Sequence, residues 1–127
     1  MANVFVVDDD PQIRTWLRHL LEAKGYSVEE FEDGDAVQAS LQQNRPDLLV
    51  LDIYLPGKEG FEIILRLKLQ AHPVKILAIS GNVFEGFDTC ATAKLLGADD
   101  ALAKPFNAET FLKRVDGLLS YPSEDVC

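Results

Sequence analysis

The feature that most constrains the fold is an alternation, repeated five times, between short apolar runs and segments whose apolar residues recur at helical spacing. We expect strands at about 4–7, 27–31, 48–51, 74–79 and 101–103. The helices between and after them are expected at about 11–24, 36–43, 61–69, 84–96 and 107–119. Such an alternation predicts an α/β domain with a parallel sheet and helices on both faces.

Several residues mark the expected helix ends. Asp10 is suited to cap the first helix, Pro11 suits its first position, and Gly25 suits the stop after it. Asn107 is suited to cap the last helix. The stretch 33–35, Asp-Gly-Asp, is expected to form a turn before the second helix.

Strand composition predicts the order of the strands. The first, third and fourth are almost entirely apolar, as expected for strands covered on both faces. The second contains Glu29 and Glu30, and the fifth follows Asp99 and Asp100, so these two belong at the edges. With right-handed crossovers, we expect a doubly wound, five-stranded parallel sheet in the order 2-1-3-4-5 with five helices, the flavodoxin-like arrangement.

Length and charge limit the classes of protein that fit. The 127 residues suit one domain, which we expect over 1–120, with 121–127 as a tail or the start of a linker. Neither a membrane-spanning run nor a secretory signal is visible, and two cysteines make no disulfide framework, so a cytoplasmic protein is expected. A net charge of −9 argues against direct binding to nucleic acid.

Polar residues follow four of the predicted strands at the point where each strand ends. Asp8 and Asp9 follow the first strand, Asp52 the third, Ser80 the fourth and Lys104 the fifth. The carboxyl ends of parallel strands share one edge of the sheet, and ligands of open α/β sheets bind there. We therefore expect three carboxylates, a hydroxyl and an ammonium group in one small site.

This set of groups suits phosphoryl chemistry. Crowded carboxylates repel one another, and Mg²⁺, which prefers oxygen ligands, would relieve that repulsion. Asp8 and Asp9 share a loop and are the expected ligands, whereas Asp52 stands alone and is the expected nucleophile for an acyl phosphate. Lys104 and Ser80 would contact the phosphoryl oxygens.

At these positions the sequence resembles the receiver domains of bacterial two-component response regulators. The resemblance covers about residues 3–119. Its motifs are Val-Val-Asp-Asp-Asp-Pro (6–11), Pro-Asp-Leu-Leu-Val-Leu-Asp (46–52), Leu-Pro-Gly (55–57) with Gly60, Ile-Ser-Gly (79–81), Gly-Ala-Asp-Asp (97–100) and Lys-Pro-Phe (104–106). Each motif alone is weak, but together, in this order, they are highly specific.

The resemblance implies a role for each matching residue. Asp52 would be the phosphoacceptor, and Mg²⁺ would be held by Asp8, Asp9, Asp52 and the backbone carbonyl of Tyr54. Ser80 would move toward the phosphoryl group once it is attached.

Further roles concern the surroundings of the phosphoryl group. Lys104 would pair with the aspartate and then with the phosphate, and its bond to Pro105 is expected to be cis. The side chains of Tyr54 and Asn82 would flank the site and modulate the lifetime of the phosphoryl group. We expect the Tyr54 ring to screen it from water.

The resemblance also implies function and partners. A histidine kinase or phosphotransfer protein would supply the phosphoryl group, and an unknown effector or a fused output domain would read the result. The domain would catalyse only its own phosphorylation and dephosphorylation, so it would not be an enzyme in the usual sense. One position departs from the family pattern: Ala101 stands where receivers usually carry an aromatic switch residue, which leaves the route of signal output open.

Three other functions compete with this interpretation. A phosphatase of the haloacid dehalogenase type needs a second acid two residues after the nucleophile, where this chain has Tyr54. A flavodoxin-like flavin carrier needs a phosphate-binding loop after the first strand, where three aspartates would repel phosphate. The most serious rival is a non-phosphorylated pseudo-receiver that acts as a docking module, although such a protein would usually lack an acid or the lysine.

Overall fold

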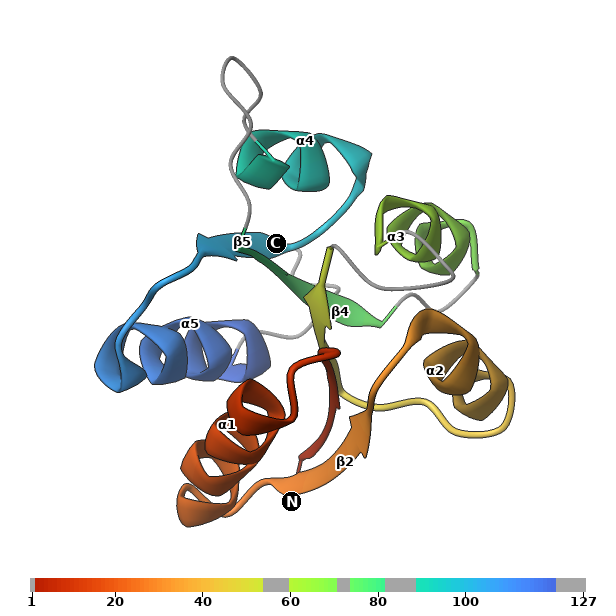
Figure 1. Cartoon of the computed structure of the whole chain (residues 1–127). Coiled ribbons are helices and arrows are strands. Elements are labelled where there is room, and N and C mark those ends of the chain that lie inside the picture. Colours follow the sequence, from red (N-terminus) through yellow and green to blue (C-terminus); the bar gives the residue numbers. More distant parts are fainter. Residues whose placement is uncertain (1, 54–59, 71–73, 82–88, 121–127) are drawn as a thin grey trace.

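A computed structural model describes residues 2–53, 60–70, 74–81 and 89–120. Five strands form a single parallel sheet in the order β2-β1-β3-β4-β5, which confirms the predicted order and the α/β fold class (Figure 1). The strands are β1 (Asn3–Val7), β2 (Ser27–Phe31), β3 (Leu48–Asp52), β4 (Lys75–Ser80) and β5 (Asp100–Ala103). The helices are α1 (Pro11–Ala23), α2 (Gly34–Leu41), α3 (Gly60–Lys68), α4 (Thr89–Leu96) and α5 (Ala108–Ser120).

Three of the predicted helix ends are confirmed. The Asp10 side chain accepts a 2.9 Å hydrogen bond from the Gln12 amide and caps α1. Gly25 has a φ of +92° just after that helix, a conformation that a residue with a Cβ rarely adopts. Asn107 accepts a 2.7 Å bond from the Thr110 amide at the start of α5.

Other boundaries differ from the prediction. The expected turn at 33–35 is wrong, because Asp33 caps α2 through a 2.8 Å bond from the Ala36 amide and the helix begins at Gly34. The expected start of the fourth helix lies outside the described residues, and the described part of α4 begins at Thr89. The third and fourth strands extend one residue further than expected, so that Asp52 and Ser80 are their last residues.

Alternating residues of the strands supply two cores, one on each face of the sheet. Phe5 and Val7 belong to the core under α2, α3 and α4, whereas Val4 and Val6 belong to the core under α1 and α5. Figure 1 shows the same division, with α1 and α5 together on one side of the sheet. The sheet is thus covered on both faces, and the carboxyl ends of its strands form an edge on which polar residues can gather.

The last helix returns along the sheet from that edge to the opposite one. Its far end is fixed by Lys75, the first residue of β4, whose ammonium group donates a 2.6 Å hydrogen bond to the carbonyl of Leu118. The Tyr26 hydroxyl, just before β2, donates a 2.5 Å bond to Asp116. Within the described part of the chain, none of the helices combines the length and apolar character that a membrane crossing requires.

Candidate functional site

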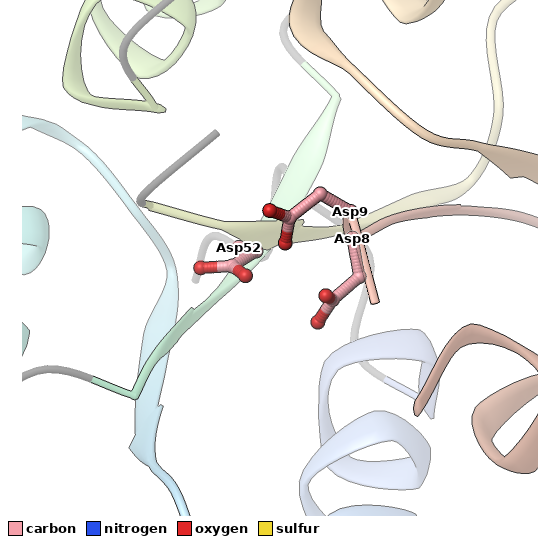
Figure 2. Close-up of side chains that lie close together, drawn as sticks. All are labelled: Asp8, Asp9 and Asp52. Atoms are coloured by element: carbon pink, nitrogen blue, oxygen red, sulfur yellow. The ribbon is translucent and has the colours of Figure 1, made fainter. Parts of the chain in front are cut away.

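The carboxylates of Asp8, Asp9 and Asp52 converge at the carboxyl ends of β1 and β3, which are neighbours in the sheet (Figure 2). One oxygen from each side chain lies within 4.8 Å of the others. Asp8 and Asp52 are buried, whereas Asp9 is exposed to solvent. The structure therefore brings together the three acids that the sequence placed at this edge, with one side of the cluster open.

Asp8 is held through both its backbone and its side chain. Its amide donates a 3.2 Å hydrogen bond to the carbonyl of Phe31 at the end of β2. Its carboxylate accepts a 2.9 Å bond from the Asp10 amide and a second 2.9 Å bond from the ammonium group of Lys104. These contacts fix a carboxylate that is only 1% exposed and would otherwise be a costly buried charge.

Lys104 lies between two of the acids. Its Nζ atom is 2.9 Å from the Oδ2 atom of Asp8 and 3.4 Å from the Oδ2 atom of Asp52. Burial lowers the pKa of Lys104, but the hydrogen bonds and negative charges of Asp8 and Asp52 outweigh that effect and raise the pKa above its ordinary value. The lysine therefore remains a cation, and it is closer to Asp8 than to the expected phosphoacceptor.

Gly81 leaves room for the lysine chain. A Cβ atom at residue 81 would lie 3.1 Å from the Cδ atom of Lys104, tighter than an ordinary contact. The absence of a side chain there allows the lysine stem to pass over the end of β4 and reach the acids. The need for room beside the Lys104 side chain thus accounts for a glycine at this position.

Ser80 is the last residue of β4 and is 1% exposed. Its carbonyl accepts a 2.8 Å hydrogen bond from the backbone amide of Lys104, so the two residues are joined across neighbouring strands. On the other side of β4, Asp52 is paired with Ile79 in the register of the sheet. The hydroxyl-bearing residue thus lies between the strands that carry the phosphoacceptor candidate and the lysine.

The structure also tests the predicted conformation of the Lys104–Pro105 bond. The bond between Lys104 and Pro105 is cis, as expected.

Tyr54 and Asn82 lie outside the described residues, so their predicted roles stay predictions. Ala101 is 7% exposed and belongs to the core under α4, together with Ala93 and Ala98. The methyl group at the position of the missing aromatic is therefore part of this buried core.

Gly60 lets α3 begin directly against the end of β3. Its amide donates a 2.9 Å hydrogen bond to the carbonyl of Ile53, the residue after Asp52. A Cβ atom at residue 60 would lie 2.5 Å from the Cα atom of Ile53, a distance that real side chains do not adopt. This close approach of two backbones fixes the chain immediately beyond the phosphoacceptor candidate.

Sequence reasoning missed Arg14 as a part of the site. Its guanidinium group donates a 2.6 Å hydrogen bond to the carbonyl of Asp8, and its side chain is only 16% exposed. A single arginine within an amphipathic helix has no spacing that distinguishes it from a solvated surface residue. Only the folded structure shows that α1 directs it toward the loop after β1.

The structure also contains a groove away from the acids. A groove of about 540 Å³ runs between α2 and α3, over an apolar floor that includes Leu41, Ile63 and Leu67. Its lining contains no member of the acid cluster. It includes Gln42 and Gln43, which follow α2 and precede β3, so the groove extends toward the amino edge of the sheet. The chemistry expected at the carboxyl edge therefore does not depend on it.

The acid cluster fits a divalent cation. Mg²⁺ binds carboxylate oxygens and keeps several water molecules, which requires a site that is partly open. Asp8 and Asp52 supply fixed, buried oxygens, and Asp9 supplies one from the solvent side. The donor set and its exposure therefore match what Mg²⁺ requires.

Comparison with known proteins agrees with this geometry. A family model described as the response regulator receiver domain matches residues 4–116. The DNA-binding dual master transcriptional regulator RpaA of Synechocystis sp. is 38% identical over 126 residues, which cover 94% of this chain and 49% of that protein. This chain spans about half the length of the curated relatives that it matches.

Solved structures show the same similarity. The chemotaxis response regulator CheY4 of Vibrio cholerae superimposes with a TM-score of 0.83 at 34% identity, covering 94% of this chain and 99% of that one. The BeF3-activated receiver domain of DrrB has a TM-score of 0.83 at 28% identity, covering 94% of this chain and 98% of that one.

Proposed function

Because this chain belongs to the response regulator receiver domain family, we propose that it accepts a phosphoryl group onto Asp52 from a histidine kinase or phosphotransfer protein in a Mg²⁺-dependent reaction. The observation that carries the proposal is the convergence of Asp8, Asp9 and Asp52 beside the Lys104 ammonium group. Receiver domains are signalling modules, so the domain would promote only its own phosphorylation and dephosphorylation.

The proposed step is an in-line transfer. A carboxylate oxygen of Asp52 attacks the phosphorus of a phosphohistidine, a P–O bond forms, and the P–N bond breaks with its electron pair returning to the imidazole. When bound, Mg²⁺ would supply positive charge that offsets the carboxylates and the phosphoryl oxygens. Asp8 and Asp9 would hold the cation with Asp52 and the Tyr54 carbonyl, and Lys104 would contact a phosphoryl oxygen.

Signal output would begin with Ser80 and Lys104. The phosphoryl group adds a charge of about −1.5 to −2, which attracts the lysine and the serine hydroxyl. Ser80 ends β4 and Lys104 directly follows β5, and the chain continues from them to α4 and α5, so their movement would bias the surface built from α4, β5 and α5. A methyl group cannot act as an aromatic switch, so with Ala101 in β5 the coupling would run through the backbone.

The family supports several further parts of the proposal. RpaA is named as a DNA-binding regulator, so an output domain or a separate effector would read the phosphorylated state here, while residues 1–120 form the receiver. The acidic receiver itself would not contact nucleic acid, and it would act in the cytoplasm. The rival interpretation as a docking module that is never phosphorylated finds no support, since Asp8, Asp9, Asp52 and Lys104 are all present.

Phosphorylation can be tested by intact mass. Incubation with acetyl phosphate and Mg²⁺ should add one phosphoryl group to the wild type and none to Asp52→Asn. The same addition should disappear when EDTA replaces Mg²⁺. A wild type that gains no phosphoryl group, or an Asp52→Asn variant that still gains one, would contradict the proposal.

The proposed screening role of Tyr54 needs a separate measurement. If its ring shields the acyl phosphate from water, the Tyr54→Ala variant should lose its phosphoryl group faster than the wild type. Asn82→Ala serves as the comparison on the other flank of the site. Equal rates of dephosphorylation in wild type and Tyr54→Ala would remove this role without affecting the assignment of Asp52.

A further inference from the structure

Arg14 contacts the loop that carries two of the acids. It lies in the first turn of α1, and its Nη1 atom donates a 2.6 Å hydrogen bond to the backbone carbonyl of Asp8. That carbonyl belongs to the planar peptide unit that joins Asp8 to Asp9. A charged donor at this short distance therefore fixes the orientation of the peptide plane from which the Asp9 side chain departs.

Glu30 holds the guanidinium group from the other side. Its Oε1 atom lies 3.2 Å from the Nε atom of Arg14, and its Oε2 atom lies 2.8 Å from the Nη1 atom of Arg18. A hydrogen bond from Arg18, and a further one from Arg14, lower the pKa of Glu30 despite its partial burial, so it stays ionised. Residue 30 lies directly beside Val6 of β1, which places the pair next to the site loop.

The backbone of Asp8 is thus fixed on both sides. Its amide is bonded to the carbonyl of Phe31 and its carbonyl to Arg14, so β2 and α1 each secure one peptide unit. Asp8 also has a buried carboxylate anchored by Lys104, whereas the exposed Asp9 owes its direction to the backbone beneath it. Removing the arginine bond would free the peptide that precedes Asp9.

We propose that Arg14, held in place by Glu30, is a positioning residue that fixes the peptide between Asp8 and Asp9 and thereby sets the affinity of the site for Mg²⁺. This inference rests on the proposed function, in which both aspartates hold the cation. Arg14 acts through the backbone and does not touch the cation, in the way that outer-sphere partners orient metal ligands.

The affinity for Mg²⁺ alone, measured by isothermal titration calorimetry, tests the inference. Arg14→Ala should weaken Mg²⁺ binding by about tenfold or more, the usual effect of losing an outer-sphere partner. Arg14→Lys should recover part of the loss, because lysine keeps one charged donor for the Asp8 carbonyl but lacks the separate Nε atom through which Arg14 contacts Glu30. Glu30→Gln should weaken binding less than Arg14→Ala, because the carbonyl bond itself remains.

Arg18→Ala is the matched control. Arg18 shares Glu30 but does not contact Asp8, and its side chain is 44% exposed. Its removal should change the Mg²⁺ affinity by less than about twofold, as expected for an exposed ion pair. Equal losses of Mg²⁺ affinity in Arg18→Ala and Arg14→Ala would mean that both arginines act only by holding α1 against β2, and would overturn the inference.

Folding and function are separated by two further measurements. Thermal unfolding without Mg²⁺ identifies any variant that fails to fold, and Glu30→Gln then carries the test in place of Arg14→Ala. A wild type that binds Mg²⁺ and is phosphorylated, with an Arg14→Ala affinity within about twofold of it, would overturn this inference alone. A wild type that binds no Mg²⁺ would overturn the proposed function and this inference together.

Discussion

The ammonium nitrogen of Lys104 lies 2.9 Å from the Oδ2 atom of Asp8, although 96 residues separate the two in the sequence. The distance from the same nitrogen to Asp52 is longer, at 3.4 Å. The lysine therefore offsets the repulsion between two buried carboxylates. A divalent cation bound by these carboxylates would offset part of the same repulsion and would compete with Lys104 for Asp8.

Replacing Lys104 separates these two contributions. Without Mg²⁺, Lys104→Met should lower the free energy of unfolding by about 1–3 kcal/mol, because two buried carboxylates lose their cationic partner. Mg²⁺ should then stabilise the variant more than the wild type, because in the variant no ammonium group competes with Mg²⁺ for the carboxylates of Asp8 and Asp52. Urea unfolding at several Mg²⁺ concentrations measures both effects.

Lys68→Met is the control for that experiment. The Lys68 side chain is 23% exposed, against 18% for Lys104, and its ammonium group lies 3.0 Å from the more exposed Asp99 on the α3 side of the domain. The variant should be less stable, yet its response to Mg²⁺ should equal that of the wild type. A Lys104→Met protein that responds to Mg²⁺ no more strongly than Lys68→Met would contradict the competition between lysine and metal.

Two adjacent aspartates should differ sharply in their effect on metal binding. Asp9→Asn removes an acid from the cluster, so the rise in melting temperature on addition of Mg²⁺ should disappear. Asp10→Asn should keep that rise, because Asp10 caps α1 outside the cluster and asparagine caps helices equally well. Differential scanning calorimetry with and without MgCl₂ compares them, and loss of the rise in both variants would argue for a general effect of charge.

Two glycines should respond in opposite directions to alanine. Gly60→Ala should destabilise the domain by about 2–4 kcal/mol, because the added Cβ would overlap the backbone of Ile53. Neither of the two backbone segments can move away without loss of packing. Gly117→Ala should stabilise it by about 0.5–1 kcal/mol, because residue 117 is an exposed position within α5 with nothing within 4 Å of the added atom. Urea unfolding measures both, and a Gly60→Ala protein as stable as the wild type would refute the close approach.

Tyr26 should titrate later than an ordinary tyrosine. Burial and the hydrogen bond to Asp116 raise its pKa from 10.0 to about 12. A raised pKa means that the folded state holds the proton more tightly, so this contribution to stability is complete below about pH 10 and is lost as the pH rises toward 12.

Two measurements check that expectation. The tyrosinate absorbance of the wild type should show a step at high pH that is absent in Tyr26→Phe. In that variant only Tyr54 and Tyr121 remain to titrate. Over the same interval the stability difference between wild type and Tyr26→Phe should shrink. A single early step for all the tyrosines would show that the hydroxyl of Tyr26 is not held by Asp116.

The order of the sheet was predictable because charge marks the edges. Glu29 and Glu30 lie on β2, one of the two edge strands, where side chains can reach water or partners on α1. The convergence of Asp8, Asp9 and Asp52 was predictable because parallel strands place their carboxyl ends at one edge of the sheet, independently of the side chains they carry.

Contacts between side chains were not predictable in the same way. The preference of Lys104 for Asp8 over Asp52 depends on a difference of about half an ångström, which no sequence pattern encodes. The role of Arg14 depends on the rotation of α1 about its own axis. The inclusion of Asp52 and Ser80 in their strands was missed because backbone pairing does not depend on the polarity of the last side chain.

The bond from Lys75 to the carbonyl of Leu118 has a mechanical consequence. It fastens the far end of a 13-residue helix to the rim of the sheet opposite the acids, about 20 Å from the helix start. The Ser120 end of α5 therefore lies at the rim of the sheet remote from Asp52. Because this end is fixed, a displacement of the first turn of α5 would tilt the helix about its contact with Lys75 instead of sliding it along the sheet.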